Sequence, residues 1–103
     1  MSDEDQALNL YIKDIECRTH AEVCMSRVPG FREQFEVAYA AWHERNRADV
    51  EHGRVLAEAR GMVGSEPPSI QAFARLTAGV LEMTADDDCA RRCFELIRGL
   101  STK

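Results

Sequence analysis

The sequence predicts an all-α protein, a bundle of four helices, or of five helices if the longest one breaks. Apolar residues recur at intervals of three and four along most of the chain. Valine, isoleucine and threonine never alternate with polar residues for long enough to form a strand. The strongest breaks are short clusters of proline, glycine and small polar residues. With 103 residues, the chain has the size of one domain, spanning residues 1–103.

The first helix is predicted to begin after Ser2 and to end near Arg27. Ser2 is a good capping residue, and acids occupy the next three positions, where they face the positive end of the helix dipole. An apolar stripe follows at helical spacing and consists of Leu8, Tyr11, Ile12 and Ile15. Pro29 and Gly30 then stop this helix.

A long second helix is predicted from Phe31 onward. It carries a stripe that must be covered by other parts of the protein, made of Phe31, Phe35, Ala38 and Trp42. Gly53 is a weak point in this helix, because glycine costs about 1 kcal/mol relative to alanine in a helix interior. A fifth helix would result from a break at this glycine. Gly61 and Gly64 close the segment.

The linker "GSEPPS" at 64–69 is the clearest break in the chain and is predicted to connect two helices. The third helix then carries apolar and small residues at helical spacing, namely Ile70, Phe73, Thr77, Val80 and Met83. The run "TADDD" at 84–88 stops this helix and begins a fourth with several acids in its first turn. The fourth helix contains Cys89, Cys93, Leu96, Ile97 and Leu100.

The four cysteines predict disulfides between the first and fourth helices. Cys17 and Cys24 are seven residues apart, or about 10.5 Å along a helix, which is too far for a bond between them. Cys89 and Cys93 are one turn apart, with parallel side-chain directions that do not favour a bond. An antiparallel packing of the two helices predicts Cys17–Cys93 and Cys24–Cys89, and a parallel packing swaps the pairs. Two such bonds would place the mature protein in an oxidising compartment.

Two other interpretations of the cysteines remain open. The thiols are reduced and buried in the first, where they behave as small hydrophobic residues. In the second, they bind zinc or Cu(I) together with His20, which lies on the same helix face as Cys17 and Cys24. The spacing of seven between Cys17 and Cys24 is not that of a structural zinc knuckle, so no metal or other cofactor is predicted.

Charge and composition exclude several classes of function. The net charge of −5 argues against binding to nucleic acids and to anionic membranes. The longest apolar run, "VAYAAW" at 37–42, is far too short to cross a bilayer. The acidic start "MSDEDQ" is not a signal peptide, so the protein is either cytoplasmic or an exported protein whose signal has been removed.

No catalytic motif is present, and the sequence therefore predicts a protein that is not an enzyme. The run "AWHERN" at 41–46 begins like a zinc-protease helix, but Arg47 stands where the second histidine of that motif belongs. Cys17 and Cys24 have only His20 near them as a base, which makes nucleophilic catalysis a minor alternative.

The stretch "VPGFREQFEVAYAAWHERN", together with the preceding cysteines, resembles a diffuse class of small helical periplasmic proteins of proteobacteria. The likeness covers about residues 17–47. Proteins of this class are usually exported and disulfide-bonded, and some similar helical proteins are immunity proteins that neutralise antibacterial effectors. The resemblance implies a periplasmic or secreted binding protein and assigns no functional residues.

The sequence thus predicts a small acidic protein-binding module, namely a periplasmic inhibitor or immunity-type protein that blocks a basic effector enzyme. A rigid surface clamped by disulfides loses little entropy on binding, and acidic residues steer a basic partner. The predicted partner-binding residues are Glu44, Arg45, Arg47, Glu51 and Glu66, in the long helix and the proline linker. The alternatives are a zinc- or copper-binding or redox protein that uses the cysteines and His20, and a cytoplasmic scaffold that forms a homodimer through its aromatic stripe.

Overall fold

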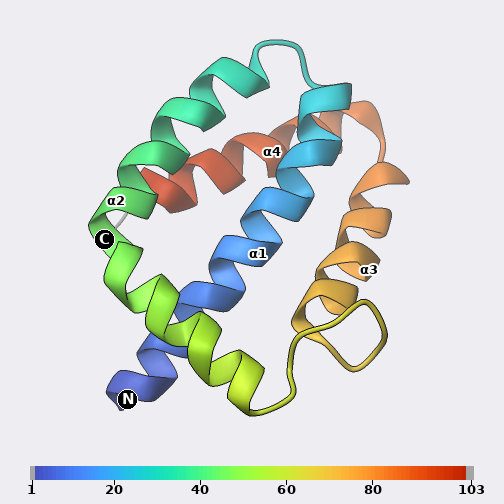
Figure 1. The fold of residues 1–103 in the computed structure, drawn as a ribbon. Helices are drawn as coiled ribbons and strands as arrows, with labels where there is room; N and C mark the ends of the chain where they lie inside the picture. Colours follow the sequence, from blue (N-terminus) through green and yellow to red (C-terminus); the bar gives the residue numbers. More distant parts are fainter. Residues whose placement is uncertain (1, 102–103) are drawn as a thin grey trace.

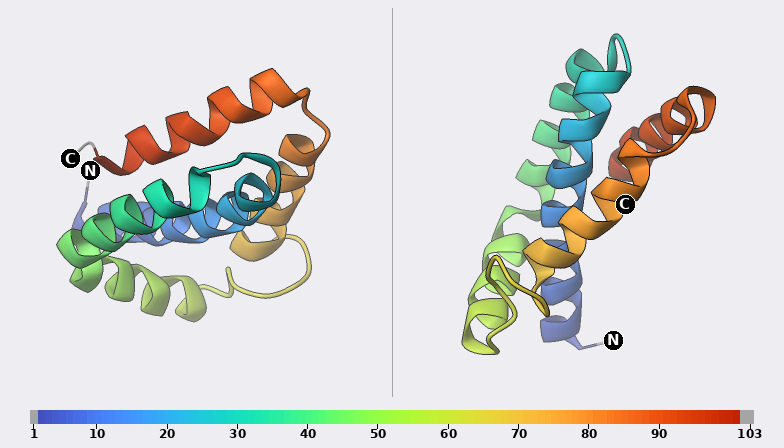
Figure 2. Two further views of the ribbon diagram at one scale, coloured as in Figure 1. Left: turned by 90° about the horizontal axis from the view of Figure 1, so that it is seen from above. Right: turned by 90° about the vertical axis from the view of Figure 1, so that its right-hand side faces the viewer.

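The computed structural model describes residues 2–101, and over this range the chain folds into four helices without strands. Their bounds are Asp3–Arg27 for α1, Phe31–Ala59 for α2, Ile70–Glu82 for α3 and Asp86–Ser101 for α4. Figure 1 shows α1 between α2 and α3, and α4 crosses the face that α1 and α2 form, as the views in Figure 2 confirm. The all-α prediction is confirmed, with four helices and not five.

The helix ends follow from local chemistry. The Ser2 hydroxyl accepts a hydrogen bond from the backbone N–H of Asp5 at 3.1 Å, which confirms Ser2 as the cap of α1. Gly30, with φ of 82°, occupies the left-handed region and allows the sharp turn into α2. Ser69 caps α3 in the same way as Ser2 caps α1, because its hydroxyl accepts from the N–H of Ala72.

The aromatic stripe of α2 forms the centre of the core. Phe31, Phe35 and Trp42 are at most 5% exposed, and the ring centroids of Phe31 and Phe35 are 5.4 Å apart. Cys24, Cys93 and other residues of α1 and α4 cover these rings in one cluster. Because the stripe is buried inside the monomer, it is not available as the homodimer interface that one of the sequence-based alternatives required.

Gly53 does not break α2, which continues through it to Ala59. It lies where α2 crosses α1 at close range: a Cβ atom at this position would stand 2.1 Å from the carbonyl oxygen of Ala7 and 2.7 Å from the Cβ of Tyr11. The glycine is therefore needed for the close approach of two helices, and the alternative of a fifth helix, which depended on a break at Gly53, does not hold.

One disulfide, Cys24–Cys93, joins α1 to α4, with a distance of 5.8 Å between the Cα atoms. The predicted link between the N- and C-terminal helices is confirmed, but the second bond is absent, since Cys17 and Cys89 are free and buried. The helices run in opposite directions, because Lys13 donates to the carbonyl of Gly99 while Cys24 faces Cys93. The pairs Cys17–Cys93 and Cys24–Cys89 are therefore wrong.

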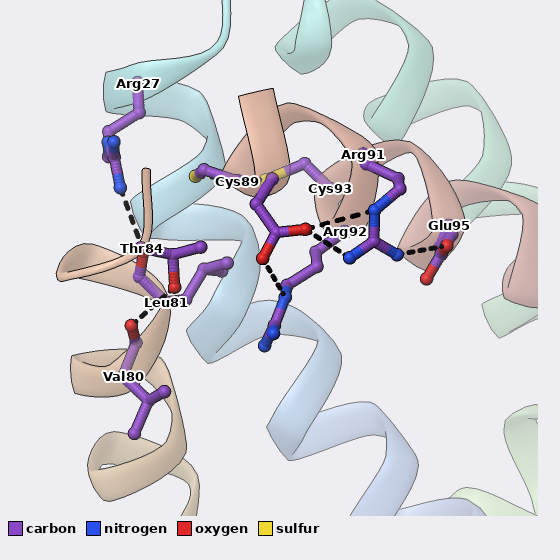
Figure 3. Close-up of polar contacts among 10 residues, drawn as sticks. Arg27, Val80, Leu81, Thr84, Cys89, Arg91, Arg92, Cys93 and Glu95 are labelled. Carbon is purple, nitrogen blue, oxygen red and sulfur yellow. Dashed lines mark hydrogen bonds and ion pairs between the residues drawn. The ribbon is translucent and has the colours of Figure 1, made fainter. Parts of the chain in front are cut away.

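The reason is a difference in spacing. The two cysteines of α1 are seven residues apart, about 10.5 Å along the helix, and those of α4 are four apart, about 6 Å. A register that aligns one pair leaves the other pair several ångströms out of reach. In Figure 3, Cys89 lies beside Cys93, and its sulfur is 4.0 Å from the Cys93 sulfur.

Basic residues fix the ends of α4 and α3. Lys13 from α1 donates to the Gly99 carbonyl at 2.9 Å, and Arg45 from α2 donates to the Leu100 carbonyl at 2.8 Å. These contacts satisfy carbonyls at the C-terminal end of α4, which carries the negative end of its dipole. Arg27 does the same for α3, with a bond to the Leu81 carbonyl at 2.9 Å (Figure 3).

Candidate functional site

The outer face of α3 carries a row of large apolar side chains that remain exposed. Figure 1 places α3 at the edge of the molecule, and its principal packing partner is α1. Alanines, Ile70 and Leu81 form the face of α3 that packs inward. The opposite face and the capping residue Met83 that follows it present what we call the outer stripe, in which the exposed fractions are 58% for Phe73, 65% for Leu76, 60% for Val80 and 89% for Met83.

A groove of about 690 Å³ adjoins this outer stripe. It lies between α1, the connection at 60–69 and α3. Phe73 and Leu76 belong both to the outer stripe and to the groove lining, which also contains Ile12, Met62, Pro67, Pro68 and Ile70. Glu16 and Arg60 are the charged residues of the lining. The two features thus form one continuous apolar surface.

Hydrogen bonds hold the wall of the groove in place. The Ser69 hydroxyl donates to the Gly64 carbonyl at 2.8 Å, and the N–H of Ile70 donates to the Met62 carbonyl at 2.8 Å. The Gln71 amide donates to the Tyr11 hydroxyl at 3.0 Å and accepts from the N–H of Gly64 at 3.1 Å. The proline connection is therefore tied to α3 at several points, and the groove is formed before any ligand binds.

The histidine that the sequence grouped with the cysteines has a different partner. The Nε2 atom of His20 lies 2.7 Å from the Thr77 hydroxyl, across the contact between α1 and α3. Burial lowers the pKa of His20 below its usual value of 6.5, although the nearby Glu16 acts in the opposite direction. His20 therefore helps to fix α3 on α1 in its neutral form.

A buried carboxylate on α1 is also structural. Asp14, 4% exposed, accepts from the Tyr39 hydroxyl at 2.5 Å and from Arg18 at 3.0 Å. Burial and the bond to Asp14 both raise the pKa of Tyr39 above its usual value. Since the charge is paired and hydrogen-bonded, this cluster joins α1 to α2 at modest cost.

The cysteines do not form a metal site in the part of the chain that the structure describes. Within residues 2–101 no three histidine, cysteine or acidic side chains are placed so that they would hold a metal ion. Burial raises the pKa of the Cys17 thiol from 9.0 to about 12, with a smaller contribution from Asp14. This thiol remains protonated at neutral pH, which is the opposite of a reactive cysteine.

The predicted partner-binding residues are distributed over two places. Glu44, Arg47 and Glu51 lie exposed on α2, where Glu44 is 3.6 Å from Arg47 and Glu51 accepts from Arg54. Arg45 bonds to the C-terminal end of α4, and Glu66 lies in the connection that forms the groove wall. The structure thus leaves most of these side chains accessible without gathering them into one site.

Sequence reasoning missed the outer stripe. The signal was present in the third helix, "IQAFARLTAGVLE", which has just two charged residues and is apolar on two opposite faces. A helix that is apolar all round is normally buried, and one face of α3 is not.

Comparison of the chain with models of known protein families, with curated proteins and with solved structures yields no match in any of the three. None of the helices described over residues 2–101 has the length and apolar character needed to cross a membrane.

Proposed function

We propose that the protein is a non-catalytic binding module that recognises another protein through the outer stripe of α3 and the adjoining groove. One observation carries this proposal: four large apolar side chains in a row are 58–89% exposed and continue into an apolar groove. Exposed apolar surface of this kind is costly for solubility and marks interaction sites on soluble proteins. Aromatic and large aliphatic side chains also dominate the binding energy of protein interfaces.

The remaining features support an inhibitor or immunity-type role in the periplasm. The disulfide between α1 and α4 favours an oxidising compartment. The net charge of −5 favours a basic partner, whose approach would be accelerated by long-range attraction. Since the groove wall is already fixed by hydrogen bonds, binding would order few additional groups and lose little entropy.

The test compares three immobilised baits in a periplasmic extract. These are the native protein, a stripe variant with Leu76→Asp and Val80→Asp, and an α2 variant with Glu44→Ala and Glu51→Ala. A protein captured by the native bait is identified by mass spectrometry, purified and titrated by calorimetry. We expect one binding site per chain, loss of binding by the stripe variant and unchanged binding by the α2 variant.

The other outcomes are equally informative. Binding that is lost with the α2 variant and retained with the stripe variant would place the site on the polar side of α2, where the sequence predicted it. Binding that survives in both variants would refute the proposed surface.

A further inference from the structure

We propose that the outer stripe of α3 pairs with the outer stripe of a second copy of this chain, with the two α3 helices antiparallel about a twofold axis. This inference goes beyond the proposed function and uses the same apolar surface, so a second copy and a partner protein would compete for it. Four observations on α3 carry it: the spacing of the stripe, the charges beside it, a glycine within it, and its area.

The spacing of the stripe is symmetric. Phe73, Leu76, Val80 and Met83 are separated by three, four and three residues, so the order of intervals is the same in both directions. It is also the spacing of a coiled-coil seam. A twofold axis at the level of Ala78, the midpoint of the stripe, places Phe73 on Met83 of the second copy and Leu76 on Val80. An interface between identical chains requires such self-complementarity.

The charges on α3 obey the same symmetry. Arg75 and Glu82 are the two charged residues of α3, one heptad apart and therefore on the same side of the helix. The twofold axis that pairs the apolar residues brings Arg75 of each copy to within one residue of the level of Glu82 of the other, on the same side of the seam. The long Arg75 side chain donates to the Ser65 carbonyl through one nitrogen, and its guanidinium offers five N–H donors in total. A parallel arrangement would instead place these charges of the two copies on opposite flanks of the seam, and the pairing of Arg75 with Glu82 would be lost.

Gly79 lies in the centre of the stripe. A Cβ atom there would meet no other atom of the chain within 4 Å, so no contact inside the monomer explains the glycine. This differs from Gly53, which is needed for the crossing of α1 and α2. Leu76, Gly79, Val80 and Met83 stand at positions i, i+3, i+4 and i+7, which form the hole that accepts a side chain in knobs-into-holes packing. A glycine in this hole lets a second helix approach closely.

The area of the stripe fits a weak dimer. From their exposed fractions, the four side chains present roughly 400–500 Å² of apolar surface, comparable with the largest patch on a typical monomer. A stable interface of standard size buries about 800 Å² on each partner. The stripe alone therefore supplies roughly half of this area. We therefore expect a dissociation constant of about 1–100 μM, as for small interfaces.

The experiment measures the mass of the disulfide-bonded full chain in solution by sedimentation equilibrium, from about 1 to 500 μM. The expected mass rises from 11.6 kDa to twice that value over this range. Leu76→Glu should remain monomeric throughout, with an unchanged circular dichroism spectrum. Val37→Glu is the matched control, because Val37 is 75% exposed on α2 and lies outside the stripe. This variant should dimerise like the native chain.

Crosslinking tests the direction of the helices. Chains with Phe73→Cys and chains with Met83→Cys are mixed in equal amounts and oxidised gently. Antiparallel α3 helices predict mixed dimers in excess over those of either variant alone. Crosslinks within each variant alone would overturn the antiparallel arrangement.

The other outcomes separate this inference from the proposed function. A mass of 11.6 kDa at every concentration, or dimers of Leu76→Glu as strong as those of the native chain, would overturn the inference. A partner captured by the native bait and lost with the stripe variant would still support the proposed function in that case. Dimers that Leu76→Glu abolishes, without any captured partner, would uphold the inference and refute the inhibitor role.

Discussion

Gly53→Ala is the substitution for which sequence and structure make opposite predictions. On helix propensity alone, alanine should stabilise the interior of α2 by about 1 kcal/mol. In the structure, the added methyl group would stand 2.1 Å from the carbonyl oxygen of Ala7, more than 1 Å inside ordinary van der Waals contact. The obstacle is the backbone of α1, which cannot rotate away, so the helices must separate.

Forced overpacking of this kind costs about 1–3 kcal/mol or more, and a rigid backbone neighbour places this site at the upper end. After the gain in propensity, we expect a net loss of about 2 kcal/mol, which lowers the melting temperature by about 10 °C in a domain of this size. Urea unfolding followed by the fluorescence of Trp42, the single tryptophan and 2% exposed, measures the loss. The control is Gly99→Ala in α4, where a Cβ atom meets nothing within 4 Å and stability should be unchanged or higher. If Gly53→Ala is as stable as the native chain, the close crossing of α1 and α2 is refuted.

Three further predictions concern the sulfur atoms and the histidine. Replacing both Cys24 and Cys93 by alanine should lower the free energy of unfolding by about 4 kcal/mol, because the bond closes a loop with a sequence separation of 69. Equal urea midpoints of the native chain with and without reductant would contradict this. Without reductant, iodoacetamide at pH 8 should leave the native chain unmodified, because Cys17 and Cys89 are buried and the Cys17 thiol, with a pKa of about 12, stays protonated. After unfolding in urea, the same reagent should add two labels, one at each of these cysteines. The pKa of His20 lies below 6.5 in the folded state, so its contribution to stability is present above pH 6.5 and is lost as the pH falls through the folded-state pKa. His20→Gln should therefore flatten the plot of unfolding free energy against pH in this range. An NMR titration midpoint of His20 above 6.5 would refute the assignment.

The helices were predictable because their signals are local. Ser2 and Ser69 are caps that act within three residues, and Pro29 stops a helix whatever surrounds it. The aromatic stripe from Phe31 to Trp42 was predicted to need cover because its period is helical, and the structure buries it.

The features that were not predicted depend on how helices are placed against one another. The bond between Cys24 and Cys93 depends on the register of α4 along α1, which no local pattern specifies. Gly53 reads as a weak point in one helix and is a contact point between two. The apolar residues of α3 show the helical period, but the period does not reveal which of the two apolar faces packs on α1. That choice exposes Phe73 and Met83 and creates the candidate surface.

The sulfur bridge also changes what a protease can do to this protein. Cys24 and Cys93 close a covalent ring that contains α2, the connection at 60–69 and α3. The exposed stretch around Glu66 lies inside that ring, so cleavage there opens it without dividing the molecule. One piece then carries α1 and α2, and the other carries α3 and α4, and the bond still holds them at high effective concentration. The nicked protein should therefore keep its assembled form until a reductant releases the two halves.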